Sequence, residues 1–67
     1  MSDSDVQELR TKFLKVFPSV PLELRDEIIA IIDENPVSWK AAFLEIQDLT
    51  QKGELILKKL KDMGIIS

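Results

Sequence analysis

The chain has 67 residues, a formal net charge of −3, and no cysteine, histidine or tyrosine. This length fits one domain, residues 1–67. Apolar residues make up 45% of the chain, a share that argues against disorder. Without cysteine and histidine the chain offers no disulfide and no ordinary zinc, haem or iron–sulfur site. We therefore expect no cofactor and no metal.

The beginning of the chain is acidic and polar, unlike a secretory signal peptide. The longest apolar run is Ile28–Ile32, whereas a membrane span needs about 20 residues. We expect a cytoplasmic protein without a membrane partner, with residues 1–3 frayed. Low asparagine and glutamine with abundant isoleucine, lysine and glutamate is also typical of thermophiles.

Apolar spacing predicts an all-α fold, a compact bundle of four short antiparallel helices. Their approximate bounds are 5–17, 21–34, 37–51 and 54–63. In the first stretch Val6, Leu9, Phe13 and Phe17 follow helical spacing, and Pro18 ends it. Short connections favour antiparallel neighbours, which completes the expected bundle.

The main stripe of the second stretch consists of Leu24, Ile28, Ile31 and Ile32, and Ile29 widens it. Isoleucine also forms strands. Because the spacing runs in threes and fours without alternation, we interpret the segment as a helix. Asn35 is then the expected N-cap of the third helix, with Pro36 at its first position.

Glycines mark the ends of the last two predicted helices. Gly53 fits a left-handed C-terminal cap of the third helix, although a merger of the two helices across it would cost only about 1 kcal/mol. Gly64 followed by Ile65 predicts a Schellman ending in which Ile65 folds back on Leu60. In the fourth helix Met63 is expected to face inward.

Motifs for catalysis are absent from the sequence. Ser38 has no histidine to activate it, so a Ser-Lys pair is the one arrangement left open for it, and a place in the first turn of a helix is its plainer role. The two glycines, eleven residues apart, form no phosphate-binding loop. We expect no enzymatic activity and no small-molecule ligand. An enzyme stays a remote alternative, because four short helices enclose little space for a pocket.

The last predicted helix is rich in lysine, which makes a small DNA-associated regulator the alternative function. Its contacts would be Lys52, Lys58, Lys59 and Lys61. A helix-turn-helix register anchored on Gly53 fails, because charged residues take the apolar positions. The sequence pI of about 4.8 also disfavours phosphate contacts, so we do not expect nucleic acid as the partner.

Apolar residues exceed what one face of a small bundle needs. Five successive apolar residues at 28–32 cover a full helical turn, so some must point away from the core. Either that helix is buried on more than one side, or the surplus meets a second copy or another protein. We favour a non-enzymatic interaction module: an adaptor, accessory subunit or regulator. Its expected contact residues are Ile29, Leu55, Ile65, Ile66, Arg25, Glu27, Lys58 and Lys59.

Overall fold

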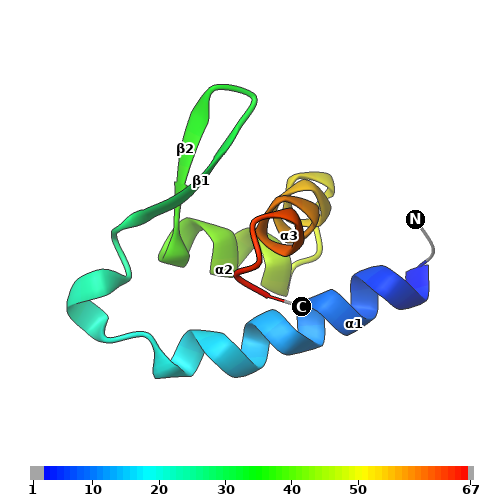
Figure 1. Ribbon diagram of the computed structural model, residues 1–67, viewed down its shortest axis with the longest axis horizontal. Helices are drawn as coiled ribbons and strands as arrows, with labels where there is room; N and C mark the ends of the chain where they lie inside the picture. The colour runs from blue at the N-terminus through cyan, green and yellow to red at the C-terminus, as the bar shows by residue number, and fades with distance from the viewer. Residues whose placement is uncertain (1–2, 67) are drawn as a thin grey trace.

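A β-hairpin separates the first helix of the molecule from the last two (Figure 1). The computed structural model describes residues 3–66, with side chains from Asp5 onward. Its main elements are α1 (Asp3–Val16), β1 (Ile28–Ile32), β2 (Asn35–Ser38), α2 (Trp39–Gln47) and α3 (Gln51–Asp62). Two short 3₁₀ turns, Phe17–Ser19 and Leu22–Leu24, connect α1 to β1. Of the residues expected to fray, 1 and 2 lie outside the described part, and Asp3 begins α1.

The prediction of an all-α bundle of four helices is wrong. Over residues 3–66 the chain forms three α-helices and one antiparallel pair of strands. The first predicted helix, 5–17, corresponds to α1, and the fourth, 54–63, lies largely within α3. The second, 21–34, is replaced by a 3₁₀ turn and β1, and the third, 37–51, shortens to α2.

The hairpin turns at Asp33 and Glu34, whose φ angles are +50° and +70°. Positive φ at both central residues is typical of a type I′ turn, whose twist matches that of the paired strands. The register then places Ile32 opposite Asn35 and Ile31 opposite Pro36. Branching at Cβ lowers the helix propensity of isoleucine and favours extended backbone, provided that a partner strand is available.

Asn35 and Pro36 are therefore strand residues, and their predicted role as a helix start is wrong. Ser38 is the N-cap of α2 instead, its Oγ accepting the Ala41 N–H at 3.1 Å. Trp39, the residue after Ser38, joins the two halves of the molecule. The backbone N–H of Trp39 donates to the carbonyl of Glu27 at 3.2 Å, and its ring centroid lies 6.0 Å from that of Phe13.

Helices α2 and α3 are separate, joined by a tight turn at residues 48–50. Leu49 adopts a φ of +50°. The N–H of Leu49 donates to the carbonyl of Ile46 at 3.0 Å, and that of Thr50 to Glu45 at 3.1 Å, which together form a Schellman ending. Thr50 also caps α3, because its Oγ1 accepts the Gly53 N–H at 3.0 Å.

Gly53 lies inside the first turn of α3, so the prediction of a C-terminal cap there is wrong. It is buried where α3 crosses α2: a Cβ at this position would clash with the carbonyl oxygen of Glu45 and lie 2.8 Å from its carbonyl carbon. The prediction at Gly64 is confirmed. Its φ is +78°, and the N–H of Ile65 donates to the carbonyl of Leu60 at 2.9 Å.

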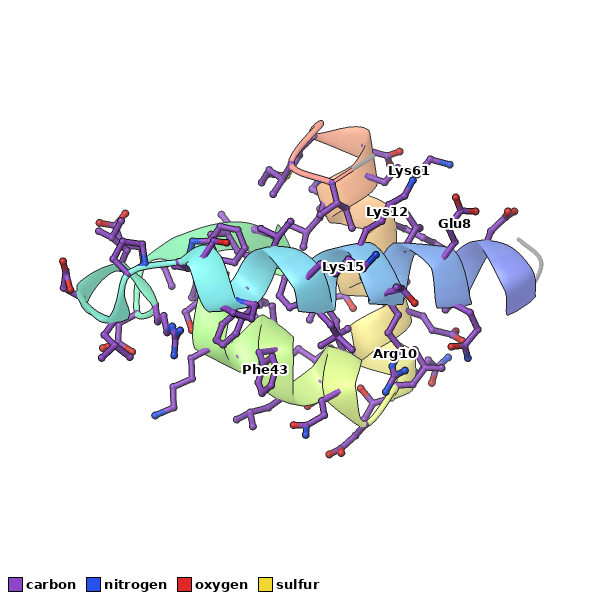
Figure 2. The ribbon with its side chains drawn as sticks, turned by 90° about the horizontal axis from the view of Figure 1, so that it is seen from below. Glu8, Arg10, Lys12, Lys15, Phe43 and Lys61 are labelled. Carbon is purple, nitrogen blue, oxygen red and sulfur yellow. The ribbon has the colours of Figure 1, made fainter. Side chains whose placement is uncertain are left out.

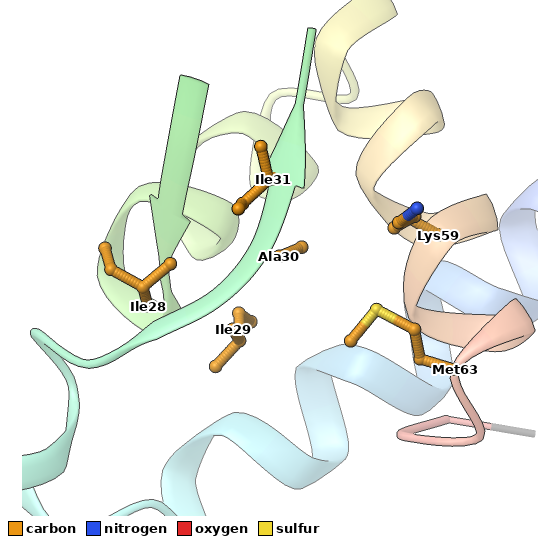
Figure 3. Close-up of a pocket in the computed structure, with 6 residues that line it drawn as sticks. All are labelled: Ile28, Ile29, Ala30, Ile31, Lys59 and Met63. Carbon is orange, nitrogen blue, oxygen red and sulfur yellow. The ribbon is translucent and has the colours of Figure 1, made fainter. Parts of the chain in front are cut away.

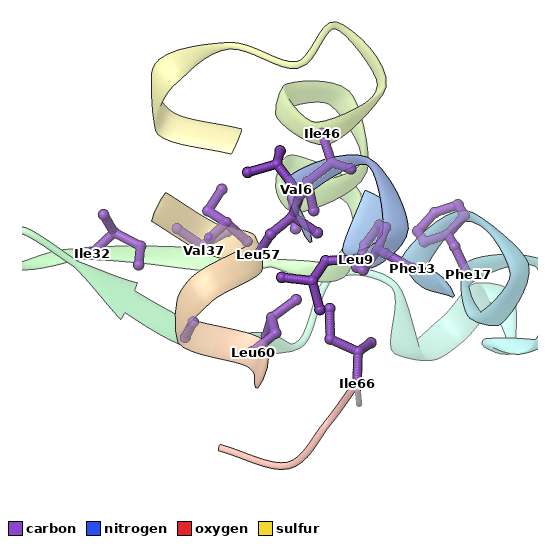
Figure 4. Close-up of a cluster of buried hydrophobic side chains, with 13 residues drawn as sticks. Val6, Leu9, Phe13, Phe17, Ile32, Val37, Ile46, Leu57, Leu60 and Ile66 are labelled. Carbon is purple, nitrogen blue, oxygen red and sulfur yellow. The ribbon is translucent and has the colours of Figure 1, made fainter. Parts of the chain in front are cut away.

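One apolar core lies where the three helices meet the inner face of the hairpin (Figure 4). Six side chains have no exposed surface: Phe13, Ala42, Ile46, Ile56, Leu57 and Leu60. The hairpin contributes Ala30, Ile32 and Val37. Cross-strand neighbours Ala30 and Val37 share the inner face, whereas Ile31 and Pro36 share the exposed outer face.

Helix α1 lies across both other helices (Figure 2). Arg10 ties it to the end of α2, with Nε donating to the carbonyl of Ile46 at 3.1 Å and Nη2 to that of Gln47 at 2.9 Å. These carbonyls end a helix and have no partner inside it, so a cation there is stabilising. Over residues 3–66, every helix is too short or too polar to cross a membrane.

Candidate functional site

Large apolar side chains are exposed unevenly over the described surface. Eight are substantially exposed, and four of these lie on β1, on α3 or at the C-cap of α3: Ile28 (55%), Ile31 (61%), Leu55 (42%) and Met63 (46%). Single exposed apolar residues are normal on a soluble protein, but a contiguous set of them marks an interaction site. The place to look for a function is therefore the space between β1 and α3.

Three adjoining hollows make that space one groove. The largest, about 420 Å³, is lined by Ile28–Ile31 together with Lys59 and Met63 (Figure 3). A hollow of about 280 Å³ continues it along Ile31, Leu55 and Lys59, and one of about 360 Å³ ends it beside Asp33, Leu55 and Lys52. We call this continuous surface the β1–α3 groove.

Charged side chains of both signs border the β1–α3 groove. Lys52, Lys58 and Lys59 come from α3, whereas Asp33 comes from the hairpin turn and Asp62 from the end of α3. All five residues are exposed. The rim is thus mixed in charge around an apolar floor, which is the usual anatomy of a protein–protein interface.

Four of the eight contact residues expected from the sequence line this groove. Leu55, Lys58 and Lys59 are exposed there, and Ile29 is half-buried. The other four lie elsewhere. Glu27 is exposed before β1, Arg25 is half-buried on another surface, Ile65 packs half-buried on the core, and Ile66 is a core residue with 4% exposure.

Sequence reasoning missed three exposed apolar residues of the groove, namely Ile28, Ile31 and Met63. All three were assigned to the inward faces of helices. For the two isoleucines the missed signal was a short run of β-branched residues bounded by polar and turn-forming residues, which is equally consistent with a buried strand. Met63 was assigned correctly to the end of the last helix, but it is 46% exposed at the rim of the groove.

A second apolar surface lies around Arg25. Its guanidinium carbon is 4.6 Å from the centroid of the Phe17 ring, which stacks on Phe43 at 4.4 Å. Arg25 Nε also donates to the carbonyl of Val20 at 3.1 Å. Leu22 and Leu44 are 75% and 52% exposed beside a hollow of about 400 Å³. This surface around Arg25 thus carries two of the eight exposed large apolar side chains, Leu22 and Leu44, whereas the β1–α3 groove carries four.

The four lysines of the DNA alternative do not share one face. Lys52, Lys58 and Lys59 border the β1–α3 groove, but Lys61 lies nine residues after Lys52, half a turn away around α3. The acidic hairpin turn stands beside the three that do cluster, since Asp33 lines the same hollows. The Asp33 carboxylate would repel the phosphate backbone of a nucleic acid bound in the groove.

Comparison with known proteins adds no family: no family model, curated protein or solved structure matches this chain. Function is therefore argued from the groove itself.

Proposed function

We propose that this chain is a non-enzymatic protein-interaction module of the cytoplasm, an adaptor, accessory subunit or regulator, and that it binds a partner protein through the β1–α3 groove. The observation that carries the proposal is the gathering of half of the exposed large apolar side chains along one groove. Covering the exposed parts of these four side chains would contribute roughly 3–6 kcal/mol.

A protein partner fits this surface better than DNA. The floor of the groove is apolar, with Leu55 in the middle of the lysines, and two carboxylates stand on the rim. Specific DNA interfaces are polar and strongly basic. Helix α3 alone supplies cations here, and the whole chain is acidic, with a net charge of −3.

The test is affinity capture with matched variants. Tagged protein carrying Leu55→Glu is compared with Leu44→Glu, because these leucines are exposed to a similar degree on different surfaces. We expect wild type and Leu44→Glu to retain one stoichiometric protein partner, and Leu55→Glu to lose it at least tenfold. Far-UV circular dichroism checks that both variants fold.

Two further arms of this capture experiment decide between partners. Nuclease treatment leaves a protein partner in place and removes one bridged by nucleic acid. Analytical ultracentrifugation of the purified chain measures self-association. Capture that disappears with nuclease, or that Leu55→Glu leaves intact, contradicts the proposal.

A further inference from the structure

The outer edge of β1 has unused backbone hydrogen-bonding groups. In an antiparallel ladder, hydrogen-bonded and non-hydrogen-bonded residue pairs alternate. Pro36 has no N–H, so its pair with Ile31 is of the non-hydrogen-bonded kind. The N–H and carbonyl of Ile31 therefore point away from β2. Ile29 has no Cα partner on β2 at all, because the register shifts between Ile28 and Ala30.

The two edges of the hairpin differ in what they offer another strand. The nitrogen of Pro36 faces the outer edge of β2 and cannot donate, which is one way that proteins block strand addition. The edge of β1 carries no proline and no lysine between Ile28 and Ile32. Of the two edges, that of β1 is the one able to accept a new strand.

The largest hollow of the groove runs along this open edge. It is lined by four successive residues of β1, Ile28–Ile31. Ala30 and Ile31 point to opposite faces of the strand, one buried and one exposed, so a hollow that touches both lies along the strand's edge. Its other wall is formed by Lys59 of α3 and by Met63 at the C-cap of that helix, and Figure 3 shows the Met63 side chain directed at the space beside β1.

We propose that an extended segment of a partner protein adds to β1 as a third strand, within the β1–α3 groove. This inference rests on the proposed function and names its binding mode. Backbone bonds to Ile31 would supply affinity, and alternate side chains of the segment would contact Met63 and Leu55.

Charge selects the partner segment and disfavours a second copy of this chain. Acidic residues precede and follow β1, Glu27 before it and Asp33–Glu34 after it, whereas the lysines of the groove, Lys52, Lys58 and Lys59, lie on the opposite wall on α3. If two copies paired antiparallel about Ala30, Glu27 of one chain would face Asp33 of the other at both ends, and like charges directly opposite are destabilising. The occupant that fits is an apolar strand with a lysine or arginine at each end.

The test uses a synthetic pool of nine-residue peptides, labelled with fluorescein and read by fluorescence anisotropy. Each peptide has lysine at both ends and valine, isoleucine or threonine at the seven central positions. Three control pools keep the central positions: one has glutamate ends, and two have backbone N-methyl groups on alternate residues, one pool for each edge of the strand. We expect saturable binding of the first pool, at least tenfold weaker binding of the glutamate-ended pool, and loss of binding for one N-methylated pool.

Protein variants test the same contact from the other side. Ile31→Pro removes the outward N–H without breaking a bond to β2, and Ile31→Val keeps that N–H. We expect the proline variant to lose peptide binding at least tenfold and the valine variant to keep it. In the wild-type protein, exchange of the Ile31 amide hydrogen should slow at least tenfold when peptide is bound, a readout that needs no mutation.

Several outcomes would overturn strand addition. They are lysine-ended peptides that fail to bind, binding that is unaffected by either N-methylated pool, and an Ile31 amide that stays unprotected. In each case the partner lost by Leu55→Glu would still support the proposed function. Protection of Ile31 that rises with protein concentration alone would make a second copy the occupant, and equal binding of glutamate-ended peptides would remove the charge argument.

Discussion

The helical part of the molecule and its hairpin are held in different ways. The three helices surround side chains with no exposed surface, such as Phe13 and Leu60. The hairpin buries only its inner face, and its outer face leaves Ile28 and Ile31 more than half exposed. Figure 1 shows the two strands projecting away from the helices. A two-stranded hairpin is marginal by itself, so this one depends on the helices for its stability.

This difference places the stability of the chain in one region and its proposed binding surface in another. Segments with few buried contacts open most easily and are the usual sources of binding elements. The groove lies at the border, with β1 as the weakly held wall and α3 as the firmly held one. Substitutions should therefore separate into those that unfold the chain and those that alter only the groove.

The largest effect is expected at Leu60, in the core of the helical part. Leu60→Ala should lower the free energy of unfolding by about 2–5 kcal/mol, because it removes a fully buried side chain and leaves a cavity. Ile31→Ala, on the exposed face of β1, should change it by less than about 0.5 kcal/mol. Urea unfolding followed by circular dichroism measures both. Equal losses would show that the two regions are held equally well.

The two glycines test the helical part at two points. Gly53→Ala should destabilise by about 1–3 kcal/mol, since its methyl group would press on the Glu45 carbonyl and force α2 and α3 apart. In Gly64→Ala the new methyl group meets no atom within 4 Å. The free energy of unfolding should fall by only about 1 kcal/mol, because alanine is strained at a φ of +78°. Thermal unfolding gives both values. If Gly53→Ala stabilises the chain through helix propensity, the close approach of the helices is refuted.

The smallest expected effect is a gain in stability from a substitution in the hairpin turn. Glu34 holds a φ of +70° in the turn, a conformation that glycine adopts without steric cost. Glu34→Gly should therefore raise the free energy of unfolding by about 0.5–1 kcal/mol, and the control Glu34→Gln should leave it nearly unchanged. Denaturant unfolding measures the difference, with amide exchange in β1 locating it. A loss of stability in the glycine variant would argue against the type I′ turn.

The helical segments could be predicted because local signals agreed with the tertiary structure. In α1 the spacing from Val6 to Phe17 and the proline after it gave the correct extent to within two residues at each end. At the end of α3, Gly64 and Ile65 specified the Schellman ending from their residue types alone.

The hairpin could not be predicted because its local signals favoured a helix. Isoleucines at 28–32 satisfy helical spacing and strand formation equally, and the choice depends on contacts with β2 and α3. Asp33-Glu34 lacks the glycine that usually announces a type I′ turn, and Asn35-Pro36 is a common way to begin a helix. Gly53 misled for a related reason, since its role is to let two backbones approach each other.

The candidate site was only half predictable for the same reason. The excess of apolar residues in the sequence pointed to Leu55 and Ile29, and both line the groove. The sequence could not show which side of this segment is exposed. The exposed residues Ile28 and Ile31 lie three apart, as on one face of a helix, because the register of β1 shifts between Ile28 and Ala30 and interrupts the alternation of the strand. Ile66 appeared surplus because it follows α3, yet it folds back into the core.

The position of Trp39 gives the chain a built-in optical reporter. It is the only tryptophan, and tyrosine is absent, so near-ultraviolet emission from the protein comes essentially from this one ring. Its backbone N–H donates a hydrogen bond to the carbonyl of Glu27, which precedes β1, and its ring lies near Phe13 in the helical core. A shift in emission on unfolding or on ligand binding therefore reads the joint between hairpin and helices, without any added label.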